Sequence, residues 1–97
     1  MALEIVWTSK ASLSFEGNIQ YLRENWSDKE IGDFVSETFS VIDQVSKMPE
    51  MFPASKSKKV RKAVITPHTT LFYRIKKKKV ELIFFWDNRM NPEKRSF

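Results

Sequence analysis

Two side chains near the ends of expected strands have the chemistry to bind or act on a phosphate. His68 is the only histidine among the 97 residues, and imidazole is the one side chain that titrates naturally near pH 7. Arg89 follows the last expected strand, where loop edges expose side chains, and its planar guanidinium suits a phosphate or a carboxylate. His68 is therefore a candidate general base and Arg89 a candidate stabiliser of negative charge. The alternatives are a turn residue after Pro67 and an arginine that only pairs with Asp87.

Further cationic side chains gather in the second half of the chain. Residues 1–50 carry four basic and nine acidic side chains, a balance of −5, whereas residues 51–97 carry 13 basic and three acidic ones, a balance of +10. Such polarity is typical of a protein that binds a polyanion or an acidic protein, although a solvated basic face is the alternative. The candidate residues for binding a partner or a phosphate are Lys58, Lys59, Arg61, Lys62, Arg74 and Arg89.

Composition excludes several classes of site. The chain has no cysteine and one histidine, which excludes a disulfide scaffold, a thiolate zinc site, a cysteine nucleophile and a multi-histidine metal site. We therefore expect no metal and no cofactor. No apolar run reaches the roughly 18 residues of a membrane span, and the first residues do not read as a signal peptide. A cytoplasmic protein without membrane contact is the expectation.

The apolar periodicity predicts two helices between one early strand and three late ones. Strands are expected at residues 3–7, 59–66, 69–75 and 80–86, and helices at residues 10–26 and 27–48. Thr8 or Ser9 can cap the first helix, and Ser27 with Glu30 reads as a capping box for the second. The order β-α-α-β-β-β predicts one α+β domain over residues 1–97, with an N-terminal helical hairpin on one face of a mainly antiparallel four-stranded sheet. Residues 88–97 form a polar tail.

Strand alternation predicts that both faces of this sheet are apolar near their centres. One face of the last strand should carry Val80, Leu82, Phe84 and Trp86, and the other should carry Ile83 and Phe85. Because the helices can cover only one face, we expect the tail or another chain to cover the second. The lysines at 76–79 are more simply explained as a solvated hairpin tip. Three aromatic residues are expected to pack within the core or between helices: Trp7, Tyr21 and Trp26.

The same residues carry a resemblance that extends over nearly the whole chain. It rests on the Trp7-Thr8 helix start, on the helix with Tyr21 and Trp26, and on the stretches Arg61-Lys62-Ala63-Val64-Ile65, Leu71-Phe72-Tyr73-Arg74-Ile75 and Phe84-Phe85-Trp86-Asp87-Asn88-Arg89-Met90-Asn91-Pro92. With its size, element order and charge, the chain resembles the RelE/ParE toxin superfamily. The resemblance implies the toxin of a bacterial type II toxin–antitoxin module, such as a plasmid stabilization system. It also implies a cognate antitoxin that wraps the toxin with an acidic or amphipathic segment and neutralises it.

The superfamily contains two mechanisms. RelE-like members cleave mRNA in the ribosome, and they resemble one another in an arginine early in the middle strand, an arginine after the last strand, and a tyrosine or histidine near the C-terminus. Arg89 matches the second position, but the first falls at or near Thr70, and Glu93 to Phe97 offer neither tyrosine nor histidine. These departures favour a ParE-like toxin directed at DNA gyrase, or a non-catalytic one. A metal-independent endoribonuclease acting on ribosome-bound mRNA is the alternative, and a non-toxic nucleic-acid-binding module is the second.

Overall fold

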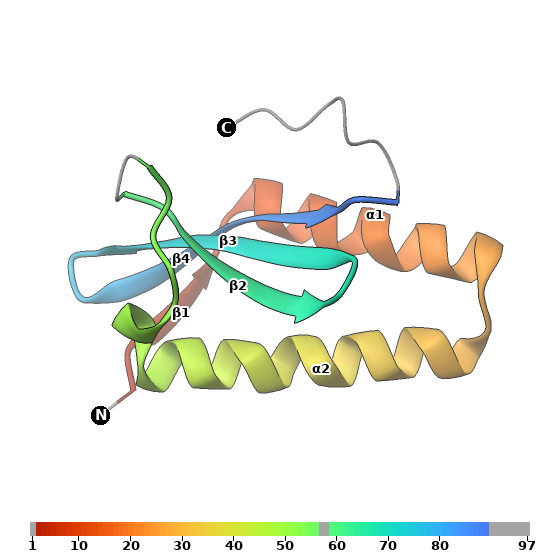
Figure 1. The fold of residues 1–97 in the computed structure, drawn as a ribbon, viewed down its shortest axis with the longest axis horizontal. Helices are drawn as coiled ribbons and strands as arrows, with labels where there is room; N and C mark the ends of the chain where they lie inside the picture. The colour runs from red at the N-terminus through yellow and green to blue at the C-terminus, as the bar shows by residue number, and fades with distance from the viewer. Residues whose placement is uncertain (1, 57–58, 90–97) are drawn as a thin grey trace.

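The chain runs through one strand, two helices and three further strands in the predicted order (Figure 1). The computed structural model describes residues 2–56 and 59–89. The elements are β1 (Glu4–Trp7), α1 (Ser9–Asn25), α2 (Asp28–Lys47), the 3₁₀ turn η1 (Pro49–Met51), β2 (Arg61–Thr66), β3 (Thr69–Lys76) and β4 (Lys79–Asp87). The predicted α+β class is confirmed. Most of the tail predicted at 88–97 lies outside the described residues.

The four strands form one mixed sheet in the order β1-β4-β3-β2. Strand β1 runs parallel to β4, and the other two pairs are antiparallel, so the sheet is mainly antiparallel as predicted. The β2–β3 turn falls at Pro67 and His68, and the β3–β4 turn falls at Lys77 and Lys78. Both of these lysines have positive φ, 54° and 62°. A two-residue hairpin turn of type I′ requires positive φ at both of its central residues.

Helix α1 takes the place of a strand along the second half of β4. Strand β1 ends at Trp7, and from there polar side chains bond to the exposed backbone of β4. The Thr8 hydroxyl donates to the Leu82 carbonyl at 2.7 Å, the Ser14 hydroxyl accepts from the Phe85 amide at 2.9 Å, and Asn18 donates to the Phe85 carbonyl at 3.3 Å. Thr8 also caps α1 by accepting from the Ala11 amide at 3.1 Å. The bonds from Ser14 and Asn18 provide partners for the backbone of Phe85 beyond the end of β1, and the Leu82 carbonyl also accepts from the Thr8 amide at 3.3 Å.

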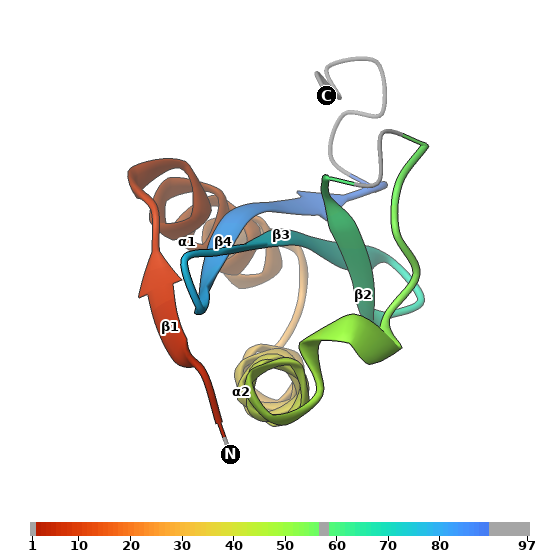
Figure 2. The same ribbon diagram turned by 90° about the vertical axis from the view of Figure 1, so that its left-hand side faces the viewer.

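The hydrophobic core lies between the two helices and one face of the sheet. Figure 2 shows α2 end-on beneath the curved sheet, between β1 and β2. Leu22 of α1 and Phe34 of α2 join Leu71 and Leu82 of the sheet in a single buried cluster. Both helices therefore bury their apolar faces against the same side of the sheet, as predicted for the helical hairpin.

The last strand does not alternate as predicted. Phe72 pairs with Phe84 and Tyr73 pairs with Leu82, so Ile83 is an extra residue that forms a β-bulge. The bulge shifts the alternation by one residue, and Phe85 and Asp87 are buried in place of Phe84 and Trp86. The predicted shared face of Val80, Leu82, Phe84 and Trp86 is therefore wrong.

The second face of the sheet is not left bare at its centre. Phe72 is only 3% exposed, and Phe84 and Trp86 are half-buried in the single chain. The sequence left open whether the tail or another chain covers this face, and at these three positions the single chain already covers it. Val64 at the β2 edge is the exception on this face, because its exposed fraction is 65%.

The capping box predicted at the start of α2 is also wrong. Ser27 is the N-cap residue, but its side chain makes no capping bond to a backbone amide. Its hydroxyl donates to the Glu30 carboxylate at 3.2 Å instead, so the two side chains satisfy each other and not the helix end.

Tyr73 gives a first test of the core. Its side chain is fully buried, and its hydroxyl donates to the Pro49 carbonyl at 2.5 Å. Tyr73→Phe should lower the free energy of unfolding by about 1–2 kcal/mol at neutral pH, because the Pro49 carbonyl loses its donor. Urea titrations of both proteins measure the loss, and Tyr21→Phe is the matched control.

The same substitution should also change the dependence on alkaline pH. Burial raises the pKa of Tyr73 to about 12, although the charge of Arg61 acts in the opposite direction. A raised pKa in the folded state means that the contribution of Tyr73 is complete below about pH 10, the ordinary tyrosine value, and is lost as the pH rises toward 12. The difference in the free energy of unfolding between wild type and Tyr73→Phe should therefore decrease between about pH 10 and pH 12. A difference that stays constant from pH 8 to pH 11.5 would contradict the assignment.

Candidate functional site

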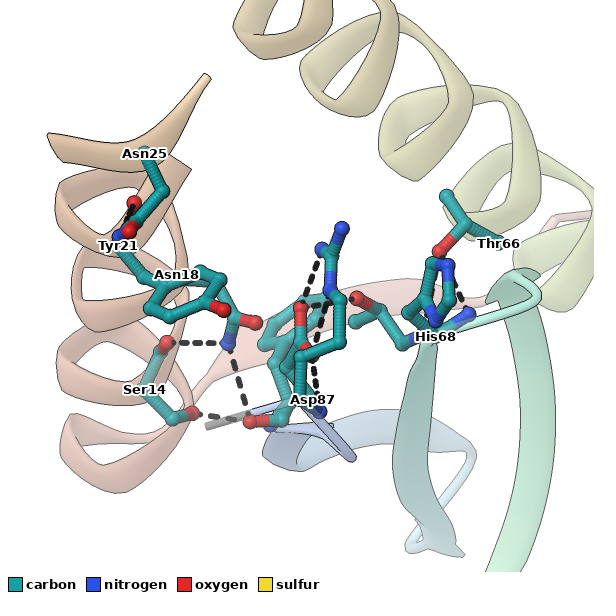
Figure 3. Close-up of polar contacts among 10 residues, drawn as sticks. Ser14, Asn18, Tyr21, Asn25, Thr66, His68 and Asp87 are labelled. Carbon is teal, nitrogen blue, oxygen red and sulfur yellow. Dashed lines mark hydrogen bonds and ion pairs between the residues drawn. The ribbon is translucent and has the colours of Figure 1, made fainter. Parts of the chain in front are cut away.

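The end of β4 holds an ion pair that organises one candidate site (Figure 3). Asp87 is only 2% exposed, and its two carboxylate oxygens accept from Nε and Nη2 of Arg89 at 3.1 and 2.7 Å. The Arg89 amide also donates to Asp87 at 2.8 Å, and the Thr69 hydroxyl donates to it at 3.2 Å. Arg89 is therefore held in place by Asp87, and this pairing is the alternative role that the sequence left open for Arg89.

Both members of the pair are stabilised in their charged forms. Burial by itself raises the pKa of Asp87, but the hydrogen bonds and charge of Arg89, with the Thr69 bond, outweigh burial and hold this pKa below its usual value. The bond to Asp87 raises the pKa of Arg89 in turn. The Arg89 guanidinium also lies over the rings of Tyr21 and Trp26, 5.6 and 5.7 Å from their centroids. These contacts fix the direction of Arg89 relative to the end of α1.

A cleft of about 510 Å³ opens beside this pair, between the end of α1, the first turns of α2 and the β2–β3 turn; we call it the α1–α2 cleft. Arg89 and His68 both line it, so the structure brings the two candidate catalytic residues into one space. His68 is exposed on the turn. Its backbone amide donates to the Thr66 hydroxyl at 3.2 Å, and its carbonyl accepts from the Asn88 amide at 2.9 Å. The backbone of His68 thus helps to anchor the chain after β4.

Sequence reasoning missed most of this cleft. Trp26 was expected to pack in the core or between the helices; it follows the last residue of α1 and is 50% exposed at the cleft wall, so it is not a core residue. Glu30, Asp33 and Glu37 also line the cleft, and all three are exposed. Their spacing of three and four residues, which places them on one side of a helix, is the signal that could have revealed them.

The charge of the α1–α2 cleft bears on its chemistry. Three carboxylates face it, and the charge of its one arginine is already balanced by Asp87. RNA cleavage without a metal requires cations that stabilise charge on a phosphate. An acidic cleft with a paired arginine repels a polyanion, so the geometry around Arg89 and His68 is poorly suited to hold RNA.

The predicted basic residues are divided among separate surfaces. Lys59, Arg61 and Arg74 line a groove of about 410 Å³ with Ile75 and Lys76, which we call the basic groove. Lys62 lines a different groove, beside Val64 and Phe52. Arg89 lies in the α1–α2 cleft, and Lys58 lies outside the described residues.

The arginines of the basic groove also serve the fold. Arg61 donates from Nη1 to the carbonyls of Phe52 at 2.7 Å and Glu50 at 3.3 Å, which fastens the turn after α2. Nε of Arg74 donates to Glu81 at 2.5 Å, and this bond lowers the pKa of Glu81. Because the Arg74 side chain stays 46% exposed, it still presents charge to the groove.

Within residues 2–56 and 59–89, no three histidine, cysteine or acidic side chains gather closely enough to hold a metal ion. Among the helices of this described part, none is long and apolar enough to cross a bilayer.

The fold can be compared with the folds of solved protein structures. It is the fold of RelE/ParE toxins, in which two helices pack on a four-stranded mixed sheet. The chromosomal ParDE TA system from P. aeruginosa aligns with a TM-score of 0.74 at 12% identity, over 89% of this chain and 96% of that one. The YoeB/ParE toxin from Agrobacterium tumefaciens aligns with a TM-score of 0.63 at 15% identity, over 88% and 98%. The E. coli DinJ-YafQ toxin-antitoxin complex gives 0.62 at 10% identity, over 92% and 96%.

At these identities the likeness is one of fold. No family model and no curated protein matches the sequence.

Proposed function

We propose that this protein is the toxin of a bacterial type II toxin–antitoxin module and acts in the cytoplasm. The observation that carries the proposal is the likeness in fold across the whole domain, because the alignment with the P. aeruginosa ParDE system covers about nine-tenths of this chain and nearly all of the other.

The basic groove is the proposed binding site for a cognate antitoxin. Lys59, Arg61 and Arg74 present positive charge beside the apolar side chain of Ile75, which is 38% exposed. Such a surface suits an acidic, partly apolar segment, because guanidinium groups bind carboxylates in a bidentate way and Ile75 offers apolar contact. Three of the neighbouring structures are complexes of a toxin with its antitoxin, which supports a protein partner of this kind.

The proposed mode of action is binding and not RNA cleavage. The acidic lining of the α1–α2 cleft and the pairing of Arg89 with Asp87 support a ParE-like toxin that traps DNA gyrase. A RelE-like, ribosome-dependent endonuclease would need free cations around the scissile phosphate, and the cleft does not offer them.

Induction in a bacterial host tests this function. Expression of the chain alone should arrest growth, and co-expression of the neighbouring reading frame should restore it. The His68→Ala variant should arrest growth as strongly as wild type, and primer extension should find no new mRNA ends, while a DNA-damage response appears. The uninduced culture is the control.

Two other outcomes of this experiment would each support a different function. New mRNA ends that vanish in His68→Ala would establish the endonuclease in place of the gyrase poison. No growth defect, with binding to nucleic acid in vitro, would support the non-toxic binding module and contradict the toxin.

A further inference from the structure

The α1–α2 cleft combines an apolar floor with an acidic wall. Leu22, Phe34 and Ile65 form the floor, and each is no more than 5% exposed over its whole surface, so the floor is firmly packed. The Trp26 ring stands at the edge of this floor, half exposed. A cleft of about 510 Å³ with a rigid apolar base has the size and character of a site that receives side chains of a partner.

The acidic wall belongs to the half of the chain that carries a net negative charge, residues 1–50. The chain carries a net charge of +5, yet Glu30, Asp33 and Glu37 all face this one cleft from α2. Asp33 is paired with Lys29 at 3.0 Å, but both side chains are largely exposed, and such a pair exchanges readily for another cation. Within the described part of the chain, Glu37 has no ion pair.

Trp26 adds a second feature that favours a cation. The Arg89 guanidinium already lies over its ring, 5.7 Å from the centroid, so the ring is in use as a cation–π acceptor. The exposed half of the indole lies in the same cleft as the three carboxylates. A lysine or arginine entering from outside can therefore meet an aromatic ring and a carboxylate together.

We propose that the α1–α2 cleft docks a cationic, amphipathic segment of a second protein. Apolar side chains of that segment lie on the floor of Leu22, Phe34 and Ile65, and its lysine or arginine side chains reach Trp26 and the acidic wall. This site is separate from the basic groove, which attracts the opposite charge. The protein thus has two binding surfaces of opposite sign, and the proposal stands whether or not the chain is a toxin.

Titration calorimetry with the full chain tests the proposal. The probe is a 14-residue helical peptide of leucine and lysine, designed with its leucines on one face, and the comparison peptide has glutamate for every lysine. The lysine peptide should bind and the glutamate peptide should not. Binding should weaken as salt is raised, because the carboxylates that attract the lysines are exposed.

Two matched triple variants locate the binding. The cleft variant carries Glu30→Gln, Asp33→Asn and Glu37→Gln, and the control variant removes three charges elsewhere by Glu16→Gln, Glu24→Gln and Asp43→Asn. Loss of three exposed charge contacts should weaken binding roughly tenfold in the cleft variant, and the control should stay within about twofold of wild type. Trp26→Ala should weaken binding as well, with circular dichroism as the check on folding.

Three results would overturn the proposal: equal weakening in both triple variants, equal binding of the two peptides, or sedimentation data that show dimers of the wild-type chain that the cleft variant does not form.

Discussion

Replacing Asp87 with alanine should lower the free energy of unfolding by about 3 kcal/mol at neutral pH. The carboxylate is 2% exposed and accepts from the side chain and amide of Arg89 and from the Thr69 hydroxyl. Its removal leaves a guanidinium without its counter-ion where the arginine side chain is only 22% exposed, and it leaves a buried hydroxyl without an acceptor. Both losses act in the same direction, because neither group can turn fully to water.

Asp43→Ala is the matched control for this prediction. It deletes the same carboxylate from an ion pair with Lys47 of similar length, 2.9 Å, in which both side chains are more than 60% exposed. The expected loss is at most about 0.5 kcal/mol, because water screens such a pair and replaces it. Urea unfolding at pH 7 measures both variants, and equal losses would contradict the buried role of Asp87.

Acid pH offers a second measurement on the same residue. The pKa of Asp87 is lowered in the folded state, so its contribution to stability is complete above about pH 4, the ordinary aspartate value, and is lost as the pH falls through the lower, folded value. The difference in the free energy of unfolding between wild type and Asp87→Ala should therefore be largest at neutral pH and should decrease on acidification. A gap that widens toward pH 3 would mean that the carboxyl is protonated in the folded protein.

The elements and their order could be predicted because their signals are local. The stripe of apolar residues every three or four positions identified α1 and α2. Thr8 and Ser9 were the two candidate caps of α1, and the bond from the Ala11 amide shows that Thr8 is the cap. The Pro67-His68 turn was likewise visible, because proline and a polar residue between two apolar runs favour a turn.

The charged surfaces could be predicted only in part, because neighbours in sequence need not be neighbours in space. Arg61 and Lys62 are adjacent, but alternation along β2 sends them into different grooves. The α1–α2 cleft was missed for the related reason that its wall, floor and edge come from α2, β2 and the end of α1. Arg89 was foreseen as either a site residue or a partner of Asp87, and the second alternative describes its contacts.

The bulge at Ile83 explains why the faces of β4 were assigned wrongly. A strand sequence specifies alternation but not the point at which the partner strand slips by one residue, since that point depends on packing across the sheet. The slip buries Phe85 and Asp87, and it thereby sets the direction from which Arg89 enters the cleft.

Phe85 and Phe84 provide the test of this bulge. Phe85 is 1% exposed, stacks on Trp7 with ring centroids 5.5 Å apart and lies 5.1 Å from the Phe15 ring. Phe85→Ala should therefore lower the free energy of unfolding by about 3–5 kcal/mol, because it leaves a cavity among rings that cannot close over it. Phe84 is half-buried on the other face, with the Lys10 ammonium 5.1 Å from its ring, so Phe84→Ala should cost clearly less.

The ranking of these two variants reports on the bulge, since both remove the same atoms from neighbouring positions of one strand. With unbroken alternation from Val80, Phe84 would point into the core and Phe85 would not, and the ranking would be reversed. Urea unfolding of the two variants at neutral pH therefore decides between the two registers. The register decides the cleft as well, because only the shifted one buries the Asp87 carboxylate beneath Arg89 and brings the guanidinium over Trp26.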